Sequence, residues 1–388
     1  MSINVKDVLK KYTMVLALIV IIIFFQMVTG GKMLLAQNIN NLISQNAYVF
    51  VLAAGMLLCI LTGGNIDLAC GSVVCFVGAI GAVMMDRGIN WVVAVIAMLI
   101  CGILVGIWQG FWIAYIKVPP FIATLAGMYA FRGFSNIVLQ GYVVSIRNTA
   151  FLNVFGGGAE CYVPDIIGGG AFNMTCLLAG VIIVAVYVAL VFKRRAGAKA
   201  AGYSVGPLAG DVAKIVCIGA AVIWFFSMLA QYKGIPTSLI WIGLVLLIYA
   251  YITANTTMGR YLYAVGGNEK ATNLSGIDSR KVYFFAYINM GLMSGLGGIL
   301  TVARATQAQP TFGQGYEMDA IAACFIGGAS AYGGEGNIFG IVIGALLMGV
   351  INMGMSIMGM EANYQKVVKG IVVLAAIIFD VLSNKKKK

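Results

Sequence analysis

The stretch "WVVAVIAMLICGILVGIWQGFWIAY", residues 91–115, contains no charged side chain. As an α-helix it would be about 37 Å long, slightly more than the hydrocarbon core of a bilayer. A backbone in lipid has to satisfy its own hydrogen bonds, and a single helix does so. We therefore expect this stretch to cross a membrane as a helix.

Similar apolar runs recur along the whole chain of 388 residues, which is 61% hydrophobic and only 10% charged. The mean hydropathy of +0.96 lies far outside the range of water-soluble globular proteins. We predict an all-α polytopic membrane protein, a single domain over 1–388, with about 12 transmembrane helices. They are expected at 12–29, 47–62, 71–86, 91–115, 120–140, 173–192, 212–231, 236–254, 282–303, 319–332, 338–359 and 365–383.

Basic residues indicate an orientation, because cytoplasmic loops of membrane proteins are enriched in Lys and Arg. With these spans the N-terminal lysines, Lys117, the cluster Lys193–Lys199 and the tail "NKKKK" fall on one side. That side is predicted to be the cytoplasm, with both termini in it. The longest outer segments are then 141–172 and 304–318.

The chemistry that the chain lacks also narrows its function. There is no histidine, and no G-x-x-x-x-G-K-[ST] phosphate loop is present. No nucleophile–base pair stands out, so we expect no catalytic residue, no metal site and no enzyme activity. The charged residues in or beside the spans lie close to span ends, as Asp67, Arg132 and Asp319 do, or near the inner surface, as Asp380 does. This placement disfavours an ion-coupled carrier, which would have carboxylates inside the membrane.

Eight cysteines lie mostly inside apolar runs without CxxC spacing, as small buried side chains do. Whether Cys161 and Cys176, which flank an outer loop, form a disulfide stays open.

Because the chain has no phosphate loop of its own, transport through it has to be driven by energy from outside the chain. One long polar segment, "GRYLYAVGGNEKATNLSGIDSRKV", residues 259–282, is a candidate attachment site for whatever supplies that energy. Asn268 suits a helix N-cap and Glu269 the first turn. Gly276 suits the left-handed position after the helix, and Ile277 the hydrophobic contact that follows it. A helix from Glu269 to Ser275 would have about two turns, too few to span a bilayer. We expect it to lie on the cytoplasmic face, although an ordinary capped loop helix fits the same residues.

Four stretches occur in an order that resembles the inner-membrane permeases of bacterial ATP-binding-cassette sugar importers, the ribose, xylose, galactose and multiple-monosaccharide group. They are "GGNIDLACGS" (63–72), "VPPFIATLAGMYAFRG" (118–133), "YAVGGNEKATNLSGI" (263–277) and "EMDAIAACFIGGASAYGGEGNIFG" (317–340). The resemblance implies a vitamin-B12-importer-like permease core of about ten helices in the bacterial cytoplasmic membrane. It also implies a homodimer or pseudo-dimer with the pathway at the interface. The implied partners are an ATP-binding-cassette ATPase in the cytoplasm, which uses the ATP, and an extracytoplasmic sugar-binding protein, and no cofactor is bound by this chain.

By this resemblance the polar segment becomes a cytoplasmic coupling loop, about 259–281, whose short helix docks on the ATPase. The predicted coupling residues are Asn268, Glu269, Lys270, Ala271, Thr272, Asn273, Leu274, Ser275, Gly276 and Ile277. The shorter ribose-type permeases lack much of 195–257. We therefore expect an inserted helical hairpin, about 196–257, formed by the spans 212–231 and 236–254, as in the longer xylose or multiple-sugar branch.

The sugar is expected to pass polar side chains in or near the spans. The predicted substrate path contains Asn65, Asp67, Thr124, Asn289 and Asn352, each of which also suits a helix–helix hydrogen bond. The 304–318 loop is expected to meet the sugar-binding protein. Permeases for nucleosides or branched-chain amino acids share this superfamily and remain alternatives for the cargo, and an ion-coupled secondary carrier is a further alternative.

Overall fold

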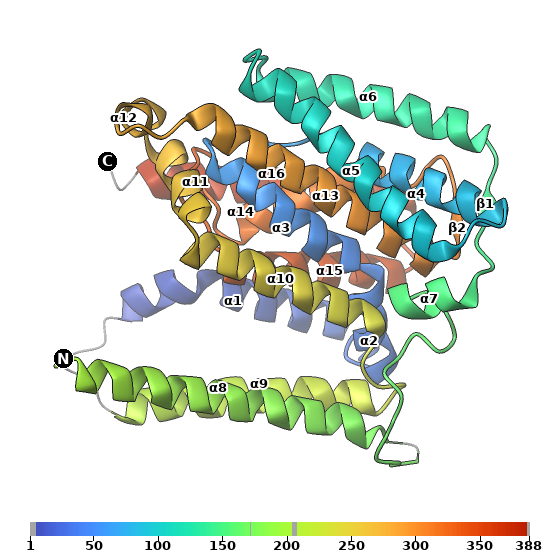
Figure 1. Ribbon diagram of the computed structural model, residues 1–388. Coiled ribbons are helices and arrows are strands. Elements are labelled where there is room, and N and C mark those ends of the chain that lie inside the picture. The colour runs from blue at the N-terminus through green and yellow to red at the C-terminus, as the bar shows by residue number, and fades with distance from the viewer. Residues whose placement is uncertain (1–4, 171, 204–207, 386–388) are drawn as a thin grey trace. The chain divides into compact units, whose positions relative to one another are not determined.

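A computed structural model describes residues 5–170, 172–203 and 208–385 (Figure 1). The helices are α1 (Val5–Val28), α2 (Ala36–Gln45), α3 (Ala47–Leu61), α4 (Cys70–Asp86), α5 (Trp91–Ala114), α6 (Pro120–Leu139), α7 (Thr149–Phe155), α8 (Met174–Ala200), α9 (Leu208–Ala230), α10 (Thr237–Asn255), α11 (Thr257–Gly267), α12 (Glu269–Leu274), α13 (Ser279–Ala305), α14 (Tyr316–Ile326), α15 (Ile338–Ile357) and α16 (Ala362–Lys385). Two short strands, β1 (Val144–Ser145) and β2 (Gln307–Ala308), pair antiparallel.

Each of the twelve expected spans coincides with one of these helices. Among the described residues, seven helices are long and apolar enough to cross a bilayer, and the pair α2 and α3, bent by 43°, makes an eighth. Met14–Val28 and Cys70–Asp86 are apolar but shorter. The expected all-α polytopic membrane fold is therefore confirmed. The lysine tail beyond residue 385 and the side chain of Asp380 lie outside the described residues.

The expected span at 319–332 differs from the others in length. Its helix, α14, has 11 residues and is roughly 16 Å long, about half the thickness of the hydrocarbon core. The chain continues from it as a glycine-rich loop, 327–337, before α15 begins. Backbone that is not helical is tolerated at this depth only where protein surrounds it, and this loop packs against the ends of α3 and α11.

Two compact units make up the described chain. Unit 1 comprises the described parts of Met1–Met33, Leu42–Cys161 and Ser238–Lys388, and unit 2 comprises those of Leu34–Asn41 and Tyr162–Thr237. In unit 1, helix α13 lies against α5, α3 and α4, and all residues of α3 are buried. Unit 1 holds all the expected coupling and path residues.

Close packing of α13 on α5 depends on glycine. A Cβ added to Gly102 would lie 2.5 Å from the carbonyl oxygen of Gly291 and 3.0 Å from the Cα of Gly295. The two backbones can approach this closely because neither helix places a side chain between them. The glycine face that the sequence shows around Gly291 is thus a helix-packing face.

Unit 2 pairs α8 with α9. A Cβ on Gly180 would lie 2.8 Å from the Cβ of Phe226, and Arg195 forms an ion pair with Asp211 near the turn between the two helices. The hairpin expected from 212–231 and 236–254 stays a prediction, since α10 lies almost wholly in unit 1. Within unit 2, α9 packs on α8, where Gly180 lets the two helices approach. That 196–257 is an insertion stays a prediction.

The loop that precedes α8 is organised by one carboxylate. Asp165 accepts hydrogen bonds from the backbone N–H of Gly169 (2.8 Å), the backbone N–H of Thr175 (3.1 Å) and the Thr175 hydroxyl (2.7 Å). These donors, the Gly169 amide first, stabilise the charged form and hold the pKa of Asp165 well below its usual value. The loop is therefore anchored to the start of α8.

Candidate functional site

The short helix α12 begins as its sequence predicts. The side-chain oxygen of Asn268 accepts a hydrogen bond from the backbone N–H of Ala271 at 3.0 Å, which satisfies one of the donors left open at a helix N-terminus. Glu269 lies in the first turn. The predicted N-cap is confirmed.

The other end of α12 has a Schellman motif. Gly276 has a φ of +85°, a left-handed conformation that glycine adopts without a steric penalty. Its N–H donates to the carbonyl of Asn273 at 3.0 Å, and the N–H of Ile277 donates to the carbonyl of Thr272 at 3.3 Å. These two bonds define the motif and confirm the predicted left-handed position of Gly276, while the hydrophobic contact expected of Ile277 stays a prediction.

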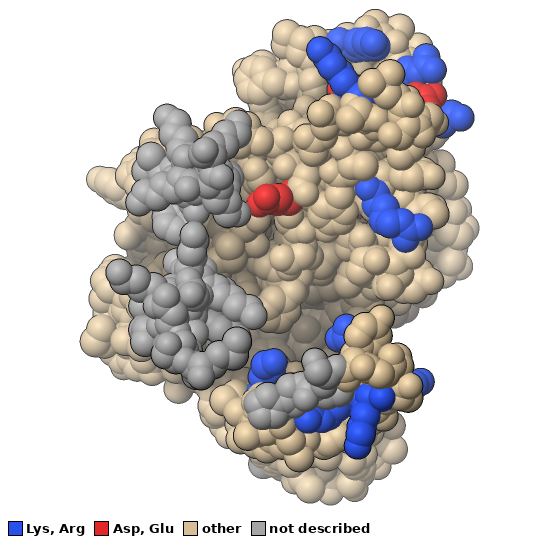
Figure 2. Space-filling model, turned by 90° about the vertical axis from the view of Figure 1, so that its left-hand side faces the viewer, with Lys and Arg blue, Asp and Glu red and all other residues tan. Residues whose placement is uncertain are grey.

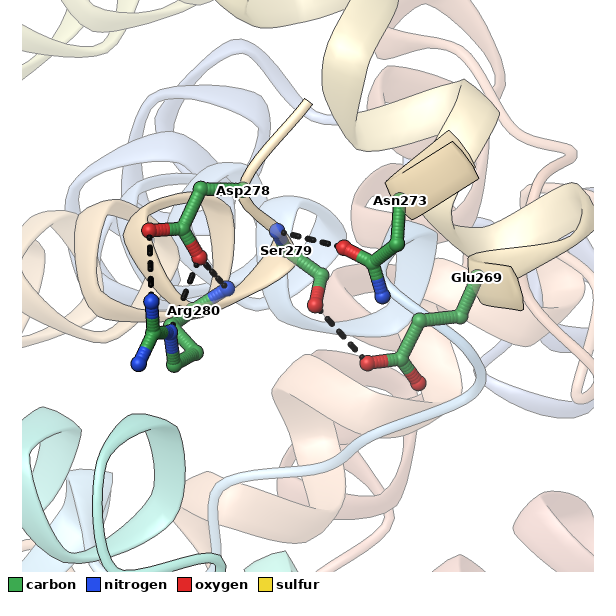
Figure 3. A network of polar contacts seen from close by, with 5 residues as sticks. All are labelled: Glu269, Asn273, Asp278, Ser279 and Arg280. Atoms are coloured by element: carbon green, nitrogen blue, oxygen red, sulfur yellow. Dashed lines mark hydrogen bonds and ion pairs between the residues drawn. The ribbon is translucent and has the colours of Figure 1, made fainter. Parts of the chain in front are cut away.

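One face of α12 is tied to the start of α13, as Figure 3 shows. Glu269 Oε1 accepts from the Ser279 hydroxyl at 2.9 Å, and its Oε2 accepts from the Tyr283 hydroxyl at 3.2 Å. One turn later, Asn273 Oδ1 accepts from the backbone N–H of Ser279 at 3.1 Å. These hydrogen bonds connect α12 directly to the first turn of α13.

Asp278 and Arg280 complete this corner (Figure 3). Asp278 Oδ1 accepts from the backbone N–H of Arg280 at 3.1 Å and from its Nε at 3.0 Å, while Oδ2 accepts from Nη2 at 3.2 Å. The bond from the Arg280 side chain holds the pKa of Asp278 below its usual value. Asp278 is thus both the N-cap of α13 and the partner of the guanidinium group.

The opposite face of α12 is exposed. Leu274 is 90% exposed, and Lys270 and Ala271 beside it are also exposed. Figure 2 shows this end of unit 1 in the upper part of the view, where Lys and Arg side chains gather. An apolar side chain that extends almost fully from a short, rigidly capped helix is suited to insertion into a partner protein.

Glycines from three distant segments meet where α11 leads into α12. A Cβ added to Gly266 would lie 2.5 Å from the backbone nitrogen of Gly334 and closer still to the carbonyl oxygen of Leu61. The Gly334 N–H donates to that same Leu61 carbonyl at 3.0 Å. We call this meeting of the ends of α3 and α11 with the 327–337 loop the glycine junction.

Two further contacts hold the glycine junction together. The Tyr263 hydroxyl of α11 donates to the carbonyl of Gly336 at 2.7 Å. A Cβ on Gly64 would overlap the backbone carbonyl of Ala331. Three of the four stretches that carry the resemblance therefore come together here: 63–72, 263–277 and 317–340.

The structure scatters the five residues of the predicted substrate path. Asn65 lines a cleft beside α12, and its Nδ2 donates to the Thr62 hydroxyl at 3.2 Å. Asp67 is buried and accepts from the backbone N–H of Ala69 at 2.7 Å. These two lie on the same loop between α3 and α4.

The other three path residues form hydrogen bonds within or between helices. The Thr124 hydroxyl donates to the carbonyl of Pro120 in its own helix at 2.9 Å. Asn289 Oδ1 accepts from the Tyr249 hydroxyl at 3.1 Å, which joins α13 to α10. Asn352 belongs to a separate cluster described next. No common path that joins the five emerges from these contacts, and their role in transport stays a prediction.

One buried ion pair was not predicted from the sequence. Asp319, placed there at a span end, is fully buried in α14, and its Oδ2 lies 2.9 Å from Lys369 Nζ of α16. The same oxygen accepts from the Tyr48 hydroxyl at 2.6 Å and from Asn352 at 3.5 Å. Asn352 also donates to Asn46 Oδ1 at 3.2 Å. The pair could have been suspected from the two lysines, Lys366 and Lys369, that lie within the apolar run 365–383.

No metal centre is evident in the parts of the chain that the structure describes, since no three Cys, Asp or Glu side chains there converge on one point. Cys176 and the six cysteines outside the 161–176 loop carry free thiols. The distinctive features of unit 1 are a capped exposed helix, the glycine junction, and a polar cleft between α12 and the end of α5.

Comparison with known proteins shows the family of the chain. Residues 38–377 match the family model described as the branched-chain amino acid transport system / permease component. The chain belongs to this permease family. It is 36% identical to the xylose transport system permease protein XylH of Haemophilus influenzae, over 98% of both chains.

Two further relatives of the permease come from Escherichia coli K12. Its xylose transport system permease protein XylH is 34% identical over 96% of this chain and 92% of that protein. Its ribose import permease protein RbsC is 34% identical over 90% of this chain and 86% of that protein. No solved structure matches the permease. The family and the helices together make it a multi-pass membrane protein that serves as the permease component of a transport system.

Proposed function

We propose that the permease is the membrane subunit of an ATP-binding-cassette importer that carries a monosaccharide across the bacterial cytoplasmic membrane. The observation that carries this proposal is similarity at 34–36% identity, over nearly the whole chain, to permeases named for xylose and ribose. The proposed partners are a cytoplasmic ATPase, an extracytoplasmic sugar-binding protein and a second copy of this chain. ATP is used by the ATPase, and the permease itself binds no cofactor.

In this proposal α12 is the coupling helix. One face is fixed to α13 through Glu269 and Asn273, and the other presents the exposed Leu274 to a partner. Closure of the ATPase subunits on ATP would move α12, and the glycine junction would pass that movement through α11 to α3 and to the 327–337 loop. ATP binding would thereby drive transport, because it changes the relative stability of the outward- and inward-facing states.

The cationic surface around α12 supports an orientation with this end in the cytoplasm, since Lys and Arg are enriched there. With α12 inside, the 304–318 segment between α13 and α14 faces outward, where a sugar-binding protein would dock. Both termini are proposed to be cytoplasmic.

The attachment of the ATPase can be tested at Leu274. Because this side chain is 90% exposed, Leu274→Asp should leave the permease folded and abolish co-purification of its ATPase. Leu208, 50% exposed at the start of α9, provides a matched control, and Leu208→Asp should co-purify normally. If the ATPase co-purifies equally with both variants, α12 is not the coupling helix.

The cargo is tested by competition in proteoliposomes that contain the permease, the ATPase and the binding protein. Uptake of labelled xylose should be inhibited by unlabelled monosaccharides and unaffected by leucine or adenosine. Inhibition by leucine instead would favour the branched-chain amino acids that the family description names. The Asp319–Lys369 pair is the observation that favours an ion-coupled carrier, and such uptake would survive without the ATPase.

A further inference from the structure

Unit 1 contains a cleft between α12 and the end of α5. Its volume is about 730 Å³, within the range of small-molecule sites. One wall is the corner between α12 and α13, which includes Glu269, Asn273, Ser279 and Tyr283. The opposite wall is the segment from Ile113 to Pro120, which ends α5 and begins α6.

The groups that line the cleft suit a neutral polyol. Glu269 provides a carboxylate, Asn65 and Asn273 provide amides, and Tyr115 provides an aromatic face. The Asp278 carboxylate in the wall is already bound by two bonds to the Arg280 side chain. With that pair neutralised, the remaining charges are one carboxylate and the ammonium group of Lys117. The lining therefore has no excess of either sign that would select an ion.

The wall opposite α12 is rigid. Pro119 and Pro120 lie at the N-cap and first position of α6, where their fixed φ angles suit the helix start. Lys117 before them has a φ of +63°, an uncommon conformation for a residue with a side chain. Preorganised walls reduce the entropy lost when a ligand binds.

Glu269 connects the cleft to the coupling helix. Its two oxygens hold Ser279 at 2.9 Å and Tyr283 at 3.2 Å, and both donors belong to α13. The longer bond, from Tyr283, is the one that a sugar hydroxyl can replace. A ligand in the cleft would thereby change the tie between α12 and α13.

We propose that this cleft is a low-affinity binding site for a neutral monosaccharide at the inner end of the transport path, with Glu269 as its main acceptor and Asn65 as a donor. The site rests on the proposed function, because that supplies the sugar. Three of the stretches that carry the family resemblance contribute to it, through Asn65, the Val118–Pro120 segment and Glu269. A release site should bind weakly, with a dissociation constant on the order of 1 mM.

Binding at this affinity can be measured by saturation-transfer-difference NMR of xylose with the full-length permease in lipid nanodiscs, without and with the ATPase. Glu269→Gln should weaken binding roughly 10-fold or more, since the sugar loses a hydrogen bond to a charged group. Asn65→Ala should also weaken it. Tyr283→Phe should strengthen it about 2- to 10-fold, because the sugar no longer displaces a hydroxyl from Glu269.

The matched control is Glu361→Gln, an exposed carboxylate before α16 that lies outside the cleft, and it should not change binding. Thermal unfolding of each variant verifies that it is folded. Equal xylose binding by wild type, Glu269→Gln and Asn65→Ala would overturn the site, as would a Tyr283→Phe variant that binds more weakly. If monosaccharide uptake is present in proteoliposomes while these results are negative, the site alone fails. If no monosaccharide is transported at all, the proposed function fails.

Discussion

Gly266→Ala is expected to disrupt the glycine junction. The new methyl carbon would overlap the Leu61 carbonyl oxygen and lie 2.5 Å from the backbone nitrogen of Gly334. Uncrowded contacts are about 3.5 Å, so backbone has to move by more than about 1 Å. Overpacking of this kind costs about 1–3 kcal/mol. The hydrogen bond from the Gly334 N–H to the Leu61 carbonyl lies at the same place, and its loss would cost about 1 kcal/mol more.

The matched control is the next residue, Gly267, where an added Cβ meets no atom within 4 Å. Both substitutions place alanine at the end of α11, so differences in helix propensity cancel. We expect Gly266→Ala to lower the free energy of unfolding and to lose uptake while the ATPase still co-purifies. Gly267→Ala should behave as wild type in unfolding and in uptake. If the two variants match in both, the glycine junction does not transmit movement.

Three further predictions concern polar contacts. Asp319→Asn or Lys369→Met alone should cost about 3–5 kcal/mol in unfolding free energy, because each leaves a charge without its partner, and the double variant should recover part of that loss. Asn268→Ala should remove the N-cap of α12, at a cost of about 1 kcal/mol, and speed hydrogen exchange of the Ala271 amide. The pKa of Asp278 is lower in the folded chain, so the stability it gives the start of α13 is complete above its unfolded value of about 3.9 and is lost as pH falls further. The protection factors of the amides there should fall on acidification in wild type, and this pH dependence should be absent in Asp278→Asn.

How far the sequence predicts the structure depends on the distance between the residues involved. The caps of α12 were predictable because Asn268, Gly276 and Ile277 act within ten residues of one another. The spans were predictable because apolar runs have to be helical in lipid. The resemblance, together with these caps, placed the coupling residues in a segment that the structure shows as an exposed helix.

Features that depend on distant residues were not predictable in this way. Asp319 and Lys369 are 50 positions apart, and the sequence does not show that α14 packs against α16. The packing of α9 on α8 was not predicted either, and it depends on Gly180, which lets the two helices approach closely. The predicted path residues were chosen for polarity alone, and each of the five forms a hydrogen bond within the protein, which for Asn289 and Asn352 joins two helices.

The most direct measurement is uptake of labelled xylose by proteoliposomes that contain the permease, its ATPase and the sugar-binding protein. Uptake should require ATP, persist when an ionophore collapses ion gradients, and disappear in Leu274→Asp. Uptake that proceeds without the ATPase and stops with the ionophore would contradict an ATP-driven permease coupled through α12.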